Sequence, residues 1–463
     1  MTEAWHQRLL FCISAIIVGT ISVGFGLGTT KAINLFFAFT GPHPMIVFAL
    51  CPIGLGVVAL LTRKVFPGAQ GSGIPQAMAA MEMQGMEFAN AMLSWRIAIG
   101  KILLTLVGFV CGASIGKEGP TVQISCSVMN SVGRLGLKPS HDLLRLLVLC
   151  GGAAGIASAF NTPIAGAVFA IEEMAHYHID GYVGRRLLMV TALSGMAMLA
   201  LVGNYTYFGT VSAVMPWGTT WAALLPIGIV GGLLGGAFAR VLIIPVAKFP
   251  RWLAWVVERQ PIGFAMLCGL ILATVGHLSG GLAFCSSYAQ ARGALHGTLL
   301  LPPSFPLLKW AATVISYMSG IPGGIFAPSL SVGAGLAYWF VPLFPHLPIS
   351  ALAMLCMAAY FSGVVQSPIT AAVIVLEMTN NIEMTVAVSA AAALGTIFSR
   401  MICPKPIYAA MSEQFIAAVG RRKSESLAGP NADAAQKPDA ARTATHGTLP
   451  VGRQRTPAGQ AEP

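Results

Sequence analysis

Charged residues are scarce in this sequence. They make up 9% of the 463 residues, whereas 56% are hydrophobic, and the mean hydropathy is +0.74. A soluble domain of this length exposes far more polar surface, so the composition indicates a polytopic membrane protein whose surroundings include lipid.

Acidic residues are the rarer of the two signs. There are 16 Asp and Glu against 27 Lys and Arg, which gives a net charge of +11. Membrane proteins concentrate Lys and Arg in their cytoplasmic loops, and this bias explains the excess. Because the basic residues are scattered among apolar runs, no nucleic-acid partner is predicted.

Cysteines show no spacing typical of a disulfide framework or a metal site. The nine cysteines are odd in number, widely separated and mostly within apolar runs. Such cysteines behave as small core residues. The sequence therefore predicts no metal and no cofactor.

Apolar runs predict an all-α membrane protein with many tilted and broken helices. The runs are 9–27, 45–61, 97–110, 187–202, 221–238, 262–275, 351–361 and 386–398. Several are shorter than the roughly 20 residues of a perpendicular span. Breaks by Gly and Pro are tolerated at membrane depth only where protein or a water-filled cavity covers the backbone.

The chain divides into three parts by composition. Residues 1–8 form a polar lead, predicted to be cytoplasmic, and residues 9–415 form the membrane domain. Residues 420–463 are rich in Ala, Pro, Gly, Thr and charge, which predicts a disordered cytoplasmic tail.

One carboxylate lies between two glycines directly after an apolar run. The motif consists of Gly116, Lys117, Glu118, Gly119 and Pro120. An ionisable group at membrane depth is costly and marks a functional site unless it is simply paired. The glycines and proline break the helix and leave N–H groups free to bind an anion. We therefore expect Glu118 to compete with a permeant anion for these donors.

Two further glycine-rich breaks carry the same kind of signal. The first is Gly71, Ser72, Gly73, Ile74 and Pro75, and the second is Gly324, Ile325, Phe326, Ala327 and Pro328. The first break is either an ordinary surface loop or a helix terminus at which the Ser72 hydroxyl faces an anion. Glycines at 151, 152 and 155, and at 228, 232 and 236, predict close helix packing instead.

Three charged residues in or beside apolar runs remain open to two interpretations each. Glu172 and Glu173 close one apolar helix, and helical neighbours point about 100° apart, so the two carboxylates cannot share one role. Either they form a solvated helix end, or one faces the protein and the other faces the aqueous side. Lys101 either supplies positive potential to an anion path or pairs with a carboxylate.

The sequence contains an internal repeat. Residues 161–172 align with residues 366–377 at a shift of 205, and residues 116–120 align with residues 324–328 at a shift of 208. Similar shifts at two places indicate duplication, with halves near 70–200 and 215–405. Glu118 then corresponds to Phe326 and Glu173 to Met378, so these two acids are additions to a shared scaffold. Broken helices at corresponding positions of two halves are typical of a transporter's substrate site.

These motifs, in this order and followed by Tyr408, resemble the CLC family of chloride channels and chloride/proton antiporters over residues 9–415. The resemblance implies inverted-repeat halves and a homodimer with one anion path per subunit. It implies that chloride binds the hydroxyls of Ser72 and Tyr408 and the N–H groups of Ile325 and Phe326. It implies that Glu118 gates the path from outside and that Glu173 transfers protons on the inner side. A bacterial relative of this kind lies in the inner membrane, with cytoplasmic termini.

Two alternatives remain beside the chloride/proton antiporter. One is a passive voltage- or pH-gated chloride channel on the same scaffold. Gln76 and Met78 stand where some bacterial relatives carry acids, which leaves the inner proton route and the charge partner of Lys101 open. The other is a membrane-embedded hydrolase that uses Ser114, in a Gly-Ala-Ser-Ile-Gly match at 112–116, or the Glu172/Glu173 pair. The hydrolase needs a His partner or a metal, which the sequence does not place near them, so the chain is not expected to be an enzyme.

Overall fold

The computed structural model describes residues 2–83, 86–135, 140–175, 181–245, 248 and 250–428. It divides into two units, Met1–Ile416 and Ala417–Pro463, and the helices from α1 to α18 belong to the first. Helix α19 (Ile407–Ala428) spans the boundary. The predicted tail begins at residue 420, whereas α19 continues to Ala428, and residues 429–463 lie outside the described part.

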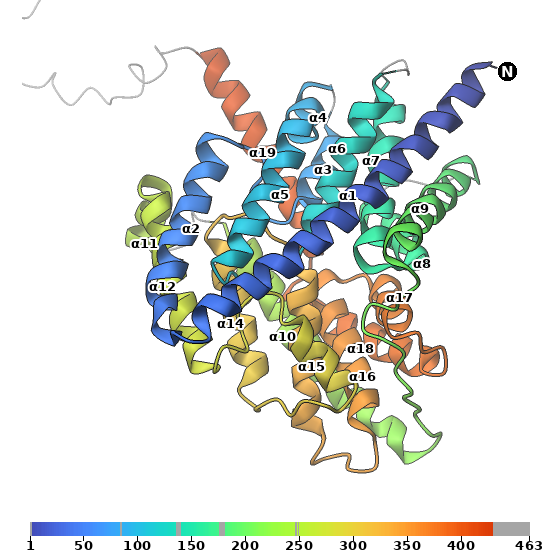
Figure 1. Cartoon of the computed structure of the whole chain (residues 1–463), viewed down its shortest axis with the longest axis vertical. Helices are drawn as coiled ribbons and strands as arrows, with labels where there is room; N and C mark the ends of the chain where they lie inside the picture. Colours follow the sequence, from blue (N-terminus) through green and yellow to red (C-terminus); the bar gives the residue numbers. More distant parts are fainter. Residues whose placement is uncertain are drawn as a thin grey trace, which may run out of the picture. The chain divides into compact units, whose positions relative to one another are not determined.

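The first unit is built from helices of very unequal length (Figure 1). The first four are α1 (Thr2–Thr40), α2 (Val47–Lys64), α3 (Ile74–Glu82) and α4 (Met86–Met92), of which α3 and α4 lie within the predicted first half. The first half continues with α5 (Trp95–Val110), α6 (Glu118–Gly133), α7 (His141–Phe160), α8 (Pro163–Phe169) and α9 (Gly181–Val202). Then come α10 (Leu224–Ile243), α11 (Arg251–Arg259), α12 (Pro261–Leu278) and α13 (Tyr288–Leu295). The second half closes with α14 (Phe305–Met318), α15 (Phe326–Phe340), α16 (Ile349–Val365), α17 (Pro368–Thr379) and α18 (Thr385–Ile402).

Every predicted apolar run lies in a helix, which confirms the all-α class. Residues 2–8 of the predicted lead already belong to α1. The runs did not include α7, which is apolar enough to cross a membrane and is mostly buried within the protein. Its glycines explain the burial, since a Cβ at Gly151 would lie 2.7 Å from the Cα of Cys126 on α6.

The repeat is visible in the order of the helices and in their breaks. Helices α5 to α9 correspond to α14 to α18, and the breaks fall at equivalent residues. Gly112 and Gly320, 208 positions apart, both have a φ of 77°, and Asn161 and Gln366, 205 apart, have φ values of 57° and 62°. Left-handed residues of this kind end a helix and turn the chain. The two inverted-repeat halves are thereby confirmed as parts of one fold.

The halves meet through paired glycines. Gly116 donates to the Gly324 carbonyl at 2.7 Å, and Gly324 donates to the Gly116 carbonyl at 2.8 Å. This reciprocal, antiparallel pairing of equivalent residues requires a local two-fold relation between the halves. Gly71 joins the same junction, because it accepts from Gly323 at 3.0 Å and donates to Ile321 at 3.1 Å.

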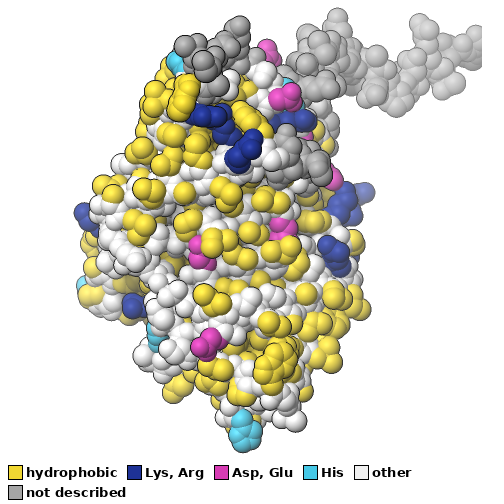
Figure 2. All heavy atoms as spheres, turned by 90° about the vertical axis from the view of Figure 1, so that its right-hand side faces the viewer, with side chains coloured by type: hydrophobic (Ala, Val, Ile, Leu, Met, Phe, Trp, Pro, Cys, Tyr) yellow, Lys and Arg dark blue, Asp and Glu magenta, His cyan; other side chains and the backbone are white. Residues whose placement is uncertain are grey.

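Among the described residues, eight helical stretches are long and apolar enough to cross a membrane. On the face in Figure 2, hydrophobic side chains predominate across the middle, and most of the visible Lys and Arg side chains lie toward the upper end. This distribution fits a belt in contact with hydrocarbon and a basic end in contact with water.

Candidate functional site

The three predicted motifs converge at the junction of the halves. Ser72 precedes α3, Glu118 begins α6 and Phe326 begins α15, and all three side chains are at most 1% exposed. Gly73 makes the turn into α3 with a φ of 98°, a conformation that favours glycine. Short helices that begin at such breaks point their free N–H groups into the centre of the protein.

The Glu118 carboxylate lies at the N-terminus of α15. Its Oε2 accepts from the Ala327 N–H at 3.4 Å, and its Oε1 has no hydrogen-bond partner among the described residues. Oε2 also fills the space in which Gly116 would carry a Cβ. The carboxylate therefore occupies a position at which N–H groups and the helix dipole attract negative charge.

Two buried hydroxyls lie at the same junction without a partner. The Ser72 and Tyr408 side chains are 0% exposed, and neither oxygen makes a hydrogen bond with another described residue. Buried hydroxyls that lack a partner are costly, so the pair indicates a ligand that accepts hydrogen bonds. A small anion meets that requirement.

The ring of Phe326 forms one wall of the junction. It packs edge-on against the ring of Phe361, with 4.8 Å between the ring centroids, and its centroid lies 5.9 Å from that of Tyr408. The N–H groups of Ile325 and Phe326 lie at the start of α15, where no helical carbonyl precedes them. Aromatic walls exclude water, and the N–H groups supply donors without a full positive charge.

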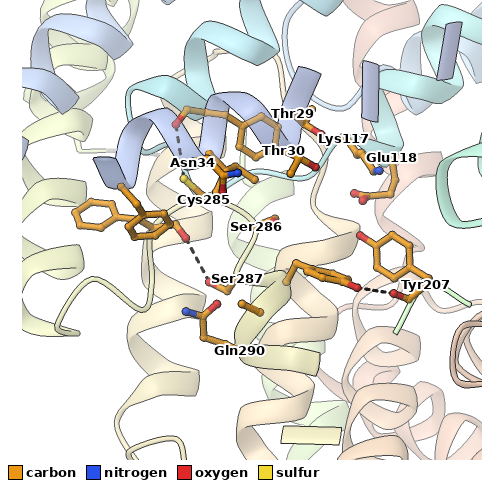
Figure 3. A pocket seen from close by; sticks show the side chains of 16 residues that line it. Thr29, Thr30, Asn34, Lys117, Glu118, Tyr207, Cys285, Ser286, Ser287 and Gln290 are labelled. Atoms are coloured by element: carbon orange, nitrogen blue, oxygen red, sulfur yellow. Dashed lines mark hydrogen bonds between the residues drawn. The ribbon is translucent and has the colours of Figure 1, made fainter. Parts of the chain in front are cut away.

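A cavity of about 230 Å³ leads to Glu118 from one side (Figure 3). Thr29, Asn34 and Ser286 line it together with Lys117 and Glu118. The hydroxyl of Tyr207 points at the Glu118 carboxylate in Figure 3, and the two groups interact electrostatically. The backbone of Tyr207 is held in turn, because its carbonyl accepts from the Tyr288 hydroxyl at 2.6 Å.

Lys101 binds backbone carbonyls and not a carboxylate. Its Nζ donates to the carbonyls of Ala69 at 2.8 Å, Gln70 at 3.3 Å and Gly71 at 2.7 Å. The side chain is 0% exposed. It thus holds the loop that presents Ser72. Of the two interpretations, pairing with a carboxylate is not observed.

Lys309 is the counterpart of Lys101 in the second half, 208 positions later. It is also 0% exposed, and its Nζ donates to the Cys285 carbonyl at 2.5 Å and to the Ser114 hydroxyl at 2.8 Å. Ser114 Oγ also lies 2.9 Å from the hydroxyl of Thr313. Ser114 is therefore part of a lysine-centred network that braces the approach to Gly116, which is not the environment of an activated serine nucleophile.

Glu173 is a second buried carboxylate, and it follows α8 in the chain. It is 4% exposed, accepts a hydrogen bond from the Ser367 hydroxyl and interacts electrostatically with Tyr408. It lies in a π-helical turn, Ala170–Met174, and such turns are frequent at functional sites.

No group of three or more His, Cys, Asp or Glu side chains is arranged to hold a metal within the part of the chain that the structure describes. Gln76 stands at a position where some bacterial relatives carry an acid. Its side-chain amide donates to the Gln70 carbonyl at 2.7 Å. Gln76 and Met78 are buried in α3, so neither position carries a charge in this segment.

Comparison with known proteins decides the family. Residues 53–400 match the profile of the voltage-gated chloride channel family, which is three quarters of the chain. The chain belongs to the CLC family. Its fold is similar to that of a slow cyanobacterial Cl⁻/H⁺ antiporter, with a TM-score of 0.73 and 24% identity over 88% of this chain and 98% of that one.

Two other CLC structures share the fold. A CLC-type fluoride/proton antiporter is 21% identical, with a TM-score of 0.72 over 89% of this chain and 98% of that one. A eukaryotic CLC transporter is 19% identical, with a TM-score of 0.70 over 88% of this chain and 74% of that one. The predicted family is confirmed, and CLC proteins are channels and transporters.

Three residues at this CLC junction were not predicted from the sequence: Lys309, Tyr317 and Tyr207. Lys309 had a usable signal, because it lies at the repeat shift of 208 from Lys101. Tyr317 had none, and its hydroxyl lies near the Ser72 backbone and donates to Met411 Sδ at 3.2 Å. Tyr207 comes from the irregular segment after α9, which neither periodicity nor the repeat places near Glu118.

Proposed function

We propose that this CLC protein exchanges chloride for protons across the membrane. The observation that carries the proposal is the position of Glu118, whose carboxylate lies at the N-terminus of α15, at the junction where the hydroxyls of Ser72 and Tyr408 have no hydrogen-bond partner among the described residues. A carboxylate and a chloride ion require the same donors. Only one of them occupies a given position at a time.

Competition for donors explains how one ion controls the other. When Glu118 is ionised, its carboxylate takes the place of an anion near Ala327. Protonation removes the negative charge and weakens the attraction of the N–H groups, so the side chain leaves and chloride enters. Each proton taken up from the cavity of Figure 3 thereby opens a place for an anion.

Glu173 supports exchange over passive conduction. A carboxylate that is 4% exposed and bound to a single hydroxyl is costly to bury, and the second half of the repeat has Met378 in its place. The scaffold folds without an acid there. We assign to Glu173 the transfer of protons on the inner side, which a channel does not need.

The proposed partners are chloride, protons, membrane lipid and a second copy of the chain. Chloride is the proposed anion because the donors at the junction are hydroxyl and N–H groups without a full charge, which bind a halide and release it again. The homodimer has one anion path in each chain. We place the protein in a bacterial inner membrane with both termini in the cytoplasm.

Reconstituted vesicles test the proposal. With a chloride gradient imposed and the membrane potential set by potassium and valinomycin, the protein should drive protons against their gradient. Glu173→Gln should stop proton movement and retain much of the chloride flux. Chloride flux without proton movement in the wild-type protein would establish a channel instead, and proton exchange driven by fluoride alone would change the assigned anion.

A further inference from the structure

Two carboxylates cap two helices across the junction of the halves. Glu377, near the end of α17, accepts from the N–H groups of Ile164 at 3.2 Å and Ala165 at 2.8 Å in the first turn of α8. Glu172 accepts from the N–H groups of Ile369 at 3.1 Å and Thr370 at 2.6 Å in the first turn of α17. Each half therefore caps the other.

The two caps are equivalent under the repeat. Glu172 and Glu377 are 205 positions apart, as are the capped residues Ile164 and Ile369. Both helices begin with a proline, so their first free N–H groups are the ones that the carboxylates bind. Ile164 and Ile369 are 65% and 61% exposed, so the capped turns lie at the surface of the chain. The caps satisfy these N–H groups and fix α8 against α17.

The symmetry fails one residue further on, at Glu173. The hydroxyl of Ser367, which directly precedes α17, donates to Glu173. Its counterpart at the start of α8 is Thr162, whose hydroxyl is buried and has no hydrogen-bond partner among the described residues. The reason is that Met378 occupies the position equivalent to Glu173. The hydroxyl that precedes the helix therefore binds a carboxylate in the second half, whereas the equivalent hydroxyl in the first half binds no described residue.

We propose that Ser367 is the hydroxyl that holds the carboxyl group of Glu173, and that Glu172 positions Ser367 by capping α17. The inference rests on the proposed role of Glu173 in proton transfer. A hydroxyl donates to the ionised carboxylate and accepts from the protonated carboxyl group, so Ser367 serves Glu173 in both states. Glu172 acts through the helix: its two hydrogen bonds to Ile369 and Thr370 fix the turn that begins one residue after Ser367.

Matched serine and threonine variants test the hydroxyl. Ser367→Ala should lower proton flux about three- to tenfold relative to chloride flux, which is the effect of one net hydrogen bond. Ser367→Thr, which restores a hydroxyl, should recover most of it. Thr162→Ala removes the equivalent hydroxyl of the other half and should leave the ratio of proton to chloride flux unchanged. Equal ratios in Ser367→Ala and Thr162→Ala would overturn the assignment.

Matched glutamine variants test the cap. Glu172→Gln and Glu377→Gln each replace one of two accepting oxygens by an amide, so both should lower the unfolding temperature to a similar extent. Only Glu172→Gln should lower proton flux, because only α17 begins beside Glu173. Equal proton flux in the two variants would show that the caps stabilise the fold and have no part in positioning Ser367.

An infrared measurement separates this inference from the proposed antiport. The C=O stretch of protonated Glu173, identified by its loss in Glu173→Gln, should shift in Ser367→Ala and remain in place in Thr162→Ala. If the wild-type protein moves no protons but the shift is present, the antiport proposal fails and the hydrogen bond stands. An unchanged stretch in Ser367→Ala refutes the hydrogen bond itself, whatever the fluxes.

Discussion

Gly119→Ala tests whether the Ser72 hydroxyl binds the anion. A Cβ at position 119 would overlap the Ser72 Oγ and would lie 3.0 Å from the Ser72 carbonyl and 3.2 Å from the Cα of Gly324. The two backbone atoms are fixed by the junction, whereas the hydroxyl is free to rotate. The substitution should therefore turn the Ser72 hydroxyl away and leave the fold intact.

The expected effect on binding is larger than the effect on folding. A hydrogen bond to a charged group contributes about 1.5–3 kcal/mol, so its loss should weaken chloride binding about 10- to 100-fold. The added methyl group should destabilise the fold by about 1–2 kcal/mol, because the displaced atom is the end of a small side chain.

Calorimetric titration of the purified protein with chloride measures this affinity. Gly184→Ala on α9 is the matched control, since a Cβ there would meet no atom within 4 Å, and it should bind chloride as the wild type does. Ser72→Ala should weaken binding to the same degree, and the double variant Gly119→Ala/Ser72→Ala should be no weaker than either single one. Wild-type affinity in Gly119→Ala, or additive losses in the double variant, would refute the reasoning.

Two further predictions follow from the cavity and the buried lysine. Tyr207→Phe removes the hydroxyl that faces Glu118, so Glu118 should compete less well and apparent chloride affinity at neutral pH should rise about two- to fivefold in the same titration. Tyr338→Phe, whose hydroxyl donates to the Leu299 carbonyl, is the control and should leave that affinity unchanged. Lys309→Met leaves the Ser114 hydroxyl and the Cys285 carbonyl without their donor, which should destabilise the protein by about 2–4 kcal/mol in thermal unfolding, whereas Lys309→Arg should retain most of the stability. A Lys309→Met protein as stable as the wild type would show that the network is not needed for folding.

Much of the fold was predictable because its signals are local or repeated. The apolar runs predicted the helices, and the aligned segments that contain Pro163 and Pro368 predicted the repeat. In the structure, each of these prolines begins a short helix. Helix α7 was not predicted as a span, although it is long enough, because its glycines at 151, 152 and 155 indicate close packing and not a span. The end of α19 at Ala428 also lies beyond the predicted start of the tail, since composition changes before the helix ends.

The candidate site was predictable in its residues and not in its contacts. Glu118 and Ser72 were predicted because helix breaks with a carboxylate or hydroxyl are unusual in an apolar chain, whereas Phe326 was predicted from the repeat and the family resemblance. The caps by Glu172 and Glu377 were not predicted, because each cap joins residues about 200 positions apart and depends on how two helices pack. Separate roles for Glu172 and Glu173 were expected from helical geometry, and the two side chains do contact different groups.

The chloride affinity of the wild type and of Glu118→Gln at several pH values tests the central claim most directly. If an ionised Glu118 competes with chloride for one position, wild-type affinity should rise as the pH falls, because protonation removes the competitor. Glu118→Gln should bind tightly at every pH. An equal dependence on pH in both proteins would contradict the competition between Glu118 and the anion.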